Sequence, residues 1–216
     1  MNTSRSLGLV ASLLGVGALL AGCASPADAG DSPAISQTAP GAALGSVAPG
    51  LPDGEVMAQG TVMDVAGDVQ LCLGGILESY PPQCSGTGLP IAGWSWDGVD
   101  GAETSGEITW GAYAVQGTYD GTTFTSTQAP IMLALYDPMV PDDPTNGEPG
   151  PADEATLLTV QGEIHDALGD QALSSWPQDG RLWVQVVWDD GTVQDAADAT
   201  YGDDVVVIQS ALHEVG

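Results

Sequence analysis

The sequence predicts an α+β fold, in which a small antiparallel β-barrel or sandwich is followed by an α-β-α-β module. Three observations predict it. Short runs of β-branched and aromatic residues, separated by glycine-rich turns, fill residues 54–136. A proline-rich acidic linker over 137–152 then interrupts every apolar pattern. Over 153–216 the apolar residues take up helical spacing, with buried strands between the helices.

In the first module the clearest element is a hairpin around Asp120-Gly121. A two-residue Asp-Gly link between β-branched and aromatic flanks is typical of a type I′ turn. The other strands that we expect are residues 56–64, 69–73, 89–96 and 107–111. Five or six short strands with glycine-rich turns suggest a small barrel or sandwich, and the segment Gly60-Thr-Val, with its echo Val115-Gln-Gly-Thr-Tyr119, resembles the strand pattern of OB-like barrels.

The second module begins at Asp153, which can cap a helix that ends at Gly169. One face of this helix is apolar and carries Leu157, Val160, Ile164, Ala167 and Leu168. Residues 182–188 and 205–208 are apolar enough for buried strands. Between them, Thr192-x-x-Asp195 resembles a capping box and predicts a short helix that ends at Gly202. This order permits a parallel crossover.

The charge balance excludes several classes of function. The 216 residues include 29 acidic side chains but only two basic ones, Arg5 and Arg181, and no lysine. Sites that depend on lysine, such as a P-loop or a Schiff base, are therefore impossible. Binding to nucleic acid is also excluded, because nothing could neutralise a run of phosphates. We expect no cofactor.

The amino-terminal residues predict export and lipidation. Arg5 precedes an apolar stretch of 14 residues, Leu7–Leu20, which is too short to span a hydrocarbon core of about 30 Å. It is typical of a signal peptide, here residues 1–22. Leu20-Ala21-Gly22-Cys23 resembles the lipobox of bacterial lipoproteins, which implies cleavage before Cys23 and a lipid on its sulfur. The alternative is an ordinary secretory signal with a chance cysteine.

The mature chain is expected to start with a lipidated, disordered tether over residues 23–53, rich in alanine, proline, glycine and serine. Removing 22 of the 216 residues leaves 194, with 29 acidic side chains and one arginine. Because such a surface repels anionic headgroups, the lipid must hold the protein at the extracytoplasmic face of the membrane.

Two cysteines remain, Cys72 and Cys84. In an exported protein they predict a disulfide, with two free thiols as the alternative. The segment from Cys72 to Trp96, with Ser79-Tyr-Pro-Pro-Gln-Cys84 and Leu89-Pro-Ile-Ala-Gly-Trp94, resembles part of a family of uncharacterised actinobacterial secreted proteins and lipoproteins. The resemblance supports export and the disulfide and implies no activity.

Few residues suggest a ligand site. Trp94 and Trp96 alternate on the expected strand and Trp110 lies on a later one, so they could form an aromatic platform for sugar rings or simply fill the core. Asp97, Asp100 and Glu103 are weak candidates for a calcium site, against the simpler alternative of a solvated acidic turn.

No catalytic motif is recognisable, and we expect no catalytic residues. Neither a Gly-x-Ser-x-Gly elbow nor a His-x-x-x-His site is present. We expect a lipid-anchored, extracytoplasmic binding or structural module of the cell envelope, whose partner is a cell-wall glycan or an envelope protein. The alternatives are a carboxylate-based hydrolase that acts on cell-wall glycan, and a calcium-dependent adhesion module.

Overall fold

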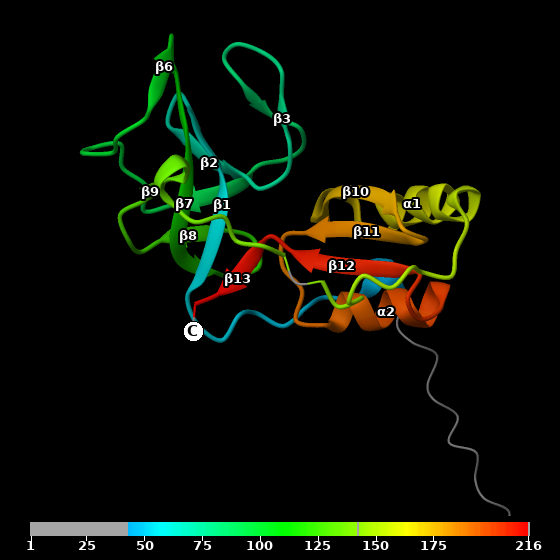
Figure 1. The fold of residues 1–216 in the computed structure, drawn as a ribbon. Helices are drawn as coiled ribbons and strands as arrows, with labels where there is room; N and C mark the ends of the chain where they lie inside the picture. The colour runs from blue at the N-terminus through cyan, green and yellow to red at the C-terminus, as the bar shows by residue number, and fades with distance from the viewer. Residues whose placement is uncertain (1–42, 142, 216) are drawn as a thin grey trace, which may run out of the picture. The chain divides into compact units, whose positions relative to one another are not determined.

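The computed structural model of the chain describes residues 43–141 and 143–215. The expected signal peptide, Cys23 and residues 24–42 of the expected tether lie outside the described residues. The described part has a mixed α+β fold, mostly strands with two helices, which confirms the predicted fold class at this level (Figure 1). None of its helices has the length and apolar character needed to cross a membrane.

Five strands close into a barrel-like sheet (Figure 1). The ring runs β1–β2–β5–β8–β7 and returns to β1, and only the β5–β8 pair is parallel. These strands are β1 (Val56–Val65), β2 (Asp68–Cys72), β5 (Leu89–Ala92), β7 (Ile108–Tyr119) and β8 (Phe124–Ser126). Alternate side chains point inward, where Val62, Tyr113, Val115 and Phe124 are completely buried. The first module is therefore a closed barrel rather than an open sandwich.

Several short elements extend this barrel. β6 (Glu103–Ser105) and β9 (Ile131–Met132) both pair with β7. β3 (Ile76–Leu77) and β4 (Gln83–Cys84) form a separate hairpin, which the Cys72–Cys84 disulfide ties to the end of β2. The predicted disulfide is thus confirmed, with 5.2 Å between the two Cα atoms. A 3-10 turn, η2 (Leu133–Leu135), follows β9.

The hairpin between β7 and β8 is confirmed as an antiparallel pair, but the type I′ turn is wrong. Tyr119 pairs with Phe124, so the loop has four residues, and of its two expected central residues only Gly121 has a positive φ, at 95°. The Asp120 carboxylate accepts hydrogen bonds from the N–H groups of Thr122 and Thr123, at 2.9 and 2.7 Å. These bonds lower the pKa of Asp120 and stabilise the wider loop.

The second module contains a strand that the sequence did not predict. Its elements are α1 (Glu154–Leu168), η3 (Gly169–Gln171), β10 (Ala172–Gln178), β11 (Arg181–Val186), α2 (Thr192–Tyr201) and β12 (Val206–Ser210). The sheet order is β10–β11–β12, with β11 and β12 parallel around α2. The expected α-β-α-β order is therefore α-β-β-α-β. The added strand β10 lies at the sheet edge, where Pro177 is tolerated because it need not donate a ladder bond.

The two helices differ in how well their caps were predicted. Asp153 accepts a hydrogen bond from the N–H of Thr156 at 2.9 Å, and α1 ends at Gly169, as expected. For α2 the expected capping box is wrong. The Asp189 carboxylate, two residues before the N-cap Gly191, accepts from the N–H groups of Val193 and Gln194, at 2.8 and 3.2 Å. It satisfies the free amides of the first turn in place of Thr192.

The last part of the expected tether is folded. Leu44, in the 3-10 turn η1 (Leu44–Ser46), is 4% exposed and belongs to the core formed by α1, α2 and the three-stranded sheet. Gly50 donates from its N–H to Asp190 at 2.8 Å and accepts from Trp188 Nε1 at 2.7 Å. The expected disorder is therefore wrong for residues 43–53, because one buried leucine and these backbone contacts order a segment of low overall hydrophobicity.

The expected linker is also bonded to the second module. The N–H of Gly150 donates to the carbonyl of Asp179 at 2.7 Å, and that of Ala152 to Gly180 at 3.2 Å. Arg181, buried at 6% exposure, donates through Nη1 to the carbonyl of Glu148. The one arginine of the described residues thus fixes the end of the acidic segment to β11.

The chain end joins the two sheets. After β12, Ala211 donates to the carbonyl of Val186 at 2.8 Å, and β13 (Leu212–Glu214) pairs with β1 of the barrel. Leu212 is completely buried opposite Ala58. Residues 212–214, within the range expected for the second module, are therefore part of the barrel sheet.

Candidate functional site

Trp94 and Trp96 lie in the loop after β5, and not on the strand where the sequence predicted them. The strand ends at Ala92 because Gly93 takes a positive φ of 72°. The two indoles nevertheless meet edge to face, with ring centroids 5.2 Å apart, and both contact the buried ring of Tyr113. They pack against the barrel core as one aromatic cluster.

Trp110 does not join this cluster. It is 7% exposed, and it packs with Met63 and Cys72 beside the disulfide. Its ring contacts Tyr80 of the disulfide loop edge to face, at a centroid distance of 5.6 Å. The three tryptophans therefore do not form one platform, and Trp110 covers the disulfide.

The acidic candidates are also divided. Asp97 and Asp100 line the same cavity as Trp94, whereas Glu103 lies on β6, paired with Trp110 of β7. Within residues 43–141 and 143–215, no group of three or more His, Cys, Asp or Glu side chains is placed to hold a metal ion. The calcium site expected from Asp97, Asp100 and Glu103 therefore has no support in the geometry.

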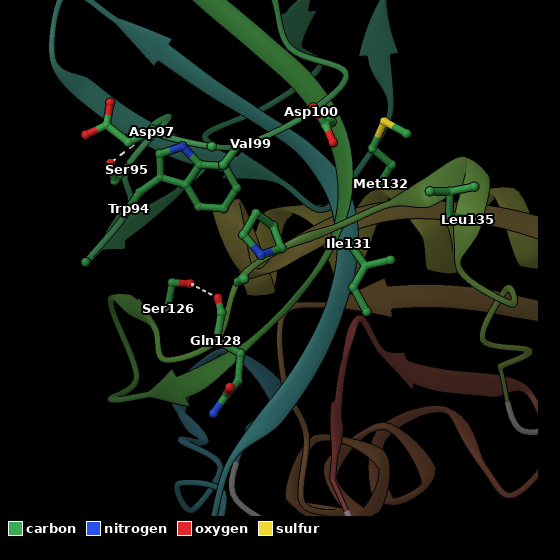
Figure 2. A pocket seen from close by; sticks show the side chains of 14 residues that line it. Trp94, Ser95, Asp97, Val99, Asp100, Ser126, Gln128, Ile131, Met132 and Leu135 are labelled. Atoms are coloured by element: carbon green, nitrogen blue, oxygen red, sulfur yellow. Dashed lines mark hydrogen bonds between the residues drawn. The ribbon is translucent and has the colours of Figure 1, made fainter.

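The cavity beside Trp94 has a volume of about 440 Å³ and is open to solvent (Figure 2). Residues from two segments line it, 93–100 and 126–135, and we call it the Trp94 groove. The two segments follow β5 and β8, the parallel pair of the barrel, so the groove lies beyond the carboxyl ends of both strands. The first segment contains the tryptophan and aspartate residues predicted from the sequence, whereas the second carries no motif.

Hydrogen bonds tie the first segment to the barrel. Trp96 donates from Nε1 to the Asp64 carboxylate at 3.0 Å, and the Tyr113 hydroxyl donates to the backbone carbonyl of Asp100, also at 3.0 Å. Burial raises the pKa of Tyr113, and the negative charge of Asp100 raises it further, so the hydroxyl stays protonated as a donor. The loop that carries Trp94, Asp97 and Asp100 is therefore held in place before any ligand arrives.

The groove combines apolar and polar surface. Ile131 is 44% exposed and Leu135 is 74% exposed at its edge, beside Met132 (Figure 2). Asp97 and Asp100 supply carboxylates on the opposite segment, and Ser95 and Gln128 supply further polar groups. A small ligand with an apolar face and several hydroxyl groups would satisfy such a lining.

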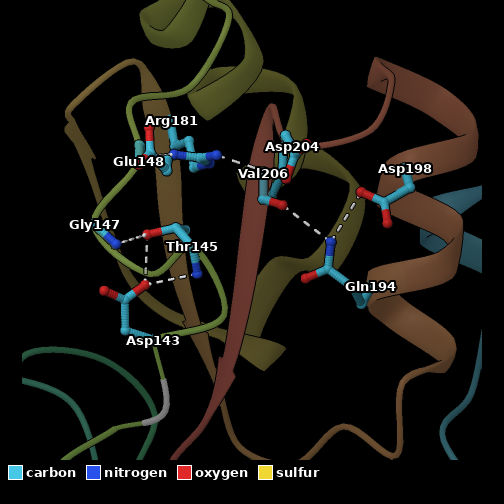
Figure 3. A network of polar contacts seen from close by, with 9 residues as sticks. All are labelled: Asp143, Thr145, Gly147, Glu148, Arg181, Gln194, Asp198, Asp204 and Val206. Carbon is cyan, nitrogen blue, oxygen red and sulfur yellow. Dashed lines mark hydrogen bonds and ion pairs between the residues drawn. The ribbon is translucent and has the colours of Figure 1, made fainter.

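A second cavity, of about 450 Å³, lies along β12 (Figure 3). Pro144 and Thr145 of the acidic segment form one wall, and α2 with Asp189 and Gln194 forms the other. We call it the β12 groove. No sequence motif indicated it, because its walls come from three separate stretches of the chain.

Comparisons with protein-family models, with curated proteins and with solved structures find no match to this chain.

Proposed function

We propose that this protein is a lipid-anchored lipoprotein of the extracytoplasmic membrane face, and that it binds a cell-wall glycan in the Trp94 groove without catalysis. The lipobox-like Leu20-Ala-Gly-Cys23 supports the anchor. The Cys72–Cys84 disulfide supports an oxidising compartment, because structural disulfides are rare where glutathione keeps thiols reduced. The observation that carries the ligand site is the preordered groove at Trp94.

We further propose that the barrel is OB-like. Its support is a closed ring of five strands in the order β1, β2, β5, β8, β7. Counted along the barrel sequence this is first, second, third, fifth, fourth, and the third and fifth strands are parallel. Five-stranded Greek-key barrels of the OB type bind oligonucleotides or oligosaccharides. The charge of this chain excludes the first ligand class and leaves the second.

The place of the groove differs from the usual OB ligand face across the second and third strands. In this chain the partly buried Leu173, Val187 and Trp188 pack against the barrel core, and Leu51 lines one small cavity together with Tyr119 and Gly121. The Trp94 groove remains open, and its apolar side chains, carboxylates and amide suit a sugar ring with hydroxyl groups around an apolar face.

The proposal is tested by sedimenting a soluble chain that begins at Ala24 with purified peptidoglycan sacculi. Asp97→Ala combined with Asp100→Ala should weaken binding about a hundredfold or more, because hydrogen bonds to a charged acceptor contribute about 1.5–3 kcal/mol each. Ala129→Trp, at an exposed lining position, should block the groove. The matched control is Asp68→Ala with Asp166→Ala, which removes the same charge from exposed positions elsewhere.

Binding that is equal in wild type, groove variants and control would overturn the Trp94 site. Absence of binding to sacculi would overturn the proposal that the ligand is a cell-wall glycan. Release of reducing ends during the incubation, lost in the groove variants, would replace the binding module by the carboxylate-based hydrolase.

A further inference from the structure

The outer edge of β12 is the open edge of the three-stranded sheet. β12 pairs only with β11 within this sheet, so one side of its backbone faces away. Leu182 donates to the carbonyl of Val205, and Ala211 donates to the carbonyl of Val186, which places the odd-numbered residues of this stretch toward β11. By the alternation of a parallel ladder, the N–H and C=O groups of Val206, Ile208 and Ser210 face the β12 groove.

A single side chain occupies part of this edge. Gln194 of α2 donates from Nε2 to the carbonyl of Val206 at 3.0 Å, and its Oε1 accepts from the N–H of Ile208 at 2.8 Å. The amide thus bonds to β12 as the N–H and C=O of one residue on a neighbouring strand would. Nε2 also donates to the Asp198 carboxylate at 2.9 Å, which orients the amide (Figure 3).

The walls of the groove are acidic. Asp189, Asp198 and Asp204 line it. Arg181, the one arginine of the described residues, already donates to the carbonyl of Glu148, and its Nη2 lies 3.6 Å from Oδ1 of Asp204. Burial raises the pKa of Asp198, the hydrogen bond from Gln194 opposes this, and the charges of Asp203, Asp195 and Asp204 add to it. A positive charge that entered the groove would relieve this repulsion.

We propose that the β12 groove is a strand-addition site, in which an extended, basic segment of a partner protein pairs with the edge of β12 and displaces the Gln194 amide. An extended peptide supplies the alternating donors and acceptors that this edge requires. Lysine or arginine side chains of the same peptide complement the acidic walls. A second copy of this chain is disfavoured at the same edge, because each copy brings the same carboxylates.

The probe is a fluorescein-labelled peptide of alternating valine and lysine, seven residues long, titrated into a soluble chain that begins at Ala24 while fluorescence anisotropy is recorded. Binding is expected, and it should slow hydrogen exchange at the N–H groups of Ile208 and Ser210. Asp198→Asn with Asp204→Asn should weaken it about tenfold. Asp68→Asn with Asp166→Asn removes the same charge from exposed positions outside the groove and should leave the affinity unchanged.

Two further arms separate strand addition from simple charge attraction. The same peptide with N-methylated backbone amides keeps its lysines but cannot pair with a strand edge, so it should bind about tenfold more weakly. Gln194→Ala should strengthen binding, because the peptide no longer has to displace the amide. Equal affinity for both peptides, or equal loss in the groove variant and its charge control, would show non-specific attraction and overturn the site.

Discussion

Replacing Gly117 by alanine is expected to lower the free energy of unfolding by about 3 kcal/mol or more. A Cβ on Gly117 would overlap the backbone carbonyl of Thr125 and lie 2.8 Å from the ring of Phe124. β7 and β8 pair at this point, Gly117 with Ser126, so neither strand can move without opening the ring. The cost therefore falls on the backbone of the barrel and not on a flexible side chain.

Gly162→Ala is the matched control, because Gly162 lies on α1, where an added Cβ would meet no atom within 4 Å. There alanine should stabilise the protein by about 1 kcal/mol through helix propensity. Urea unfolding followed by tryptophan fluorescence measures both variants. A Gly117→Ala protein as stable as wild type would contradict the closed β7–β8 pairing.

Leu212→Asp is expected to have an effect of similar size, about 4 kcal/mol or more, because it places a carboxylate in a completely buried position. Leu212 packs in the barrel core and pairs with Ala58 of β1. The carboxylate must either remain charged without a partner or take up a proton at a cost in stability. Both outcomes weaken the contact that joins the chain end to the barrel.

Val215→Asp adds the same charge three residues later, where the side chain is 43% exposed, and should change stability by about 0.5 kcal/mol or less. Thermal unfolding of both variants gives the comparison. Similar melting temperatures for the two would mean that β13 does not pair with β1 in solution.

Local signals predicted the elements whose determinants lie close together in the sequence. The α1 helix is an example, since its cap at Asp153, its apolar face and its stop at Gly169 fall within 17 residues. The Cys72–Cys84 disulfide is another, because the expected export and the short spacing of the two cysteines both favoured it. Strands β1 and β2 were also predicted within two residues of their ends.

Elements that depend on distant partners were not predicted. β13 contains only three residues, and nothing near them in the sequence indicates that β1 is their partner. Leu44 is one of few large apolar residues in a stretch rich in alanine, proline and glycine, and only the core formed with α1 and α2 explains its burial. The predicted cap of α2 was wrong for a similar reason. The N–H of Val193 in the first turn bonds to Asp189, which lies outside the helix and before the N-cap Gly191.

Only one of the two segments that line the candidate site was predicted from the sequence. Trp94, Asp97 and Asp100 come together in one groove, although they lie on a loop and not on a strand. Trp96 packs against the Trp94 ring and is held by its hydrogen bond to Asp64. Trp110 lies beside the disulfide, and Glu103 lies on β6, so neither is part of the groove. The opposite wall, residues 126–135, could not be predicted, because only the pairing of β5 with β8 brings it beside residues 93–100.

The most direct test of the account is the mass of the amino-terminal peptide from the membrane-bound protein, compared with that of a Cys23→Ala variant. We predict a chain that begins at Cys23 and carries a diacylglyceryl thioether, and a variant that keeps its leader and lacks the lipid. An unmodified Cys23 in a protein recovered from the soluble fraction would contradict the anchor, and with it the proposed role at the cell envelope.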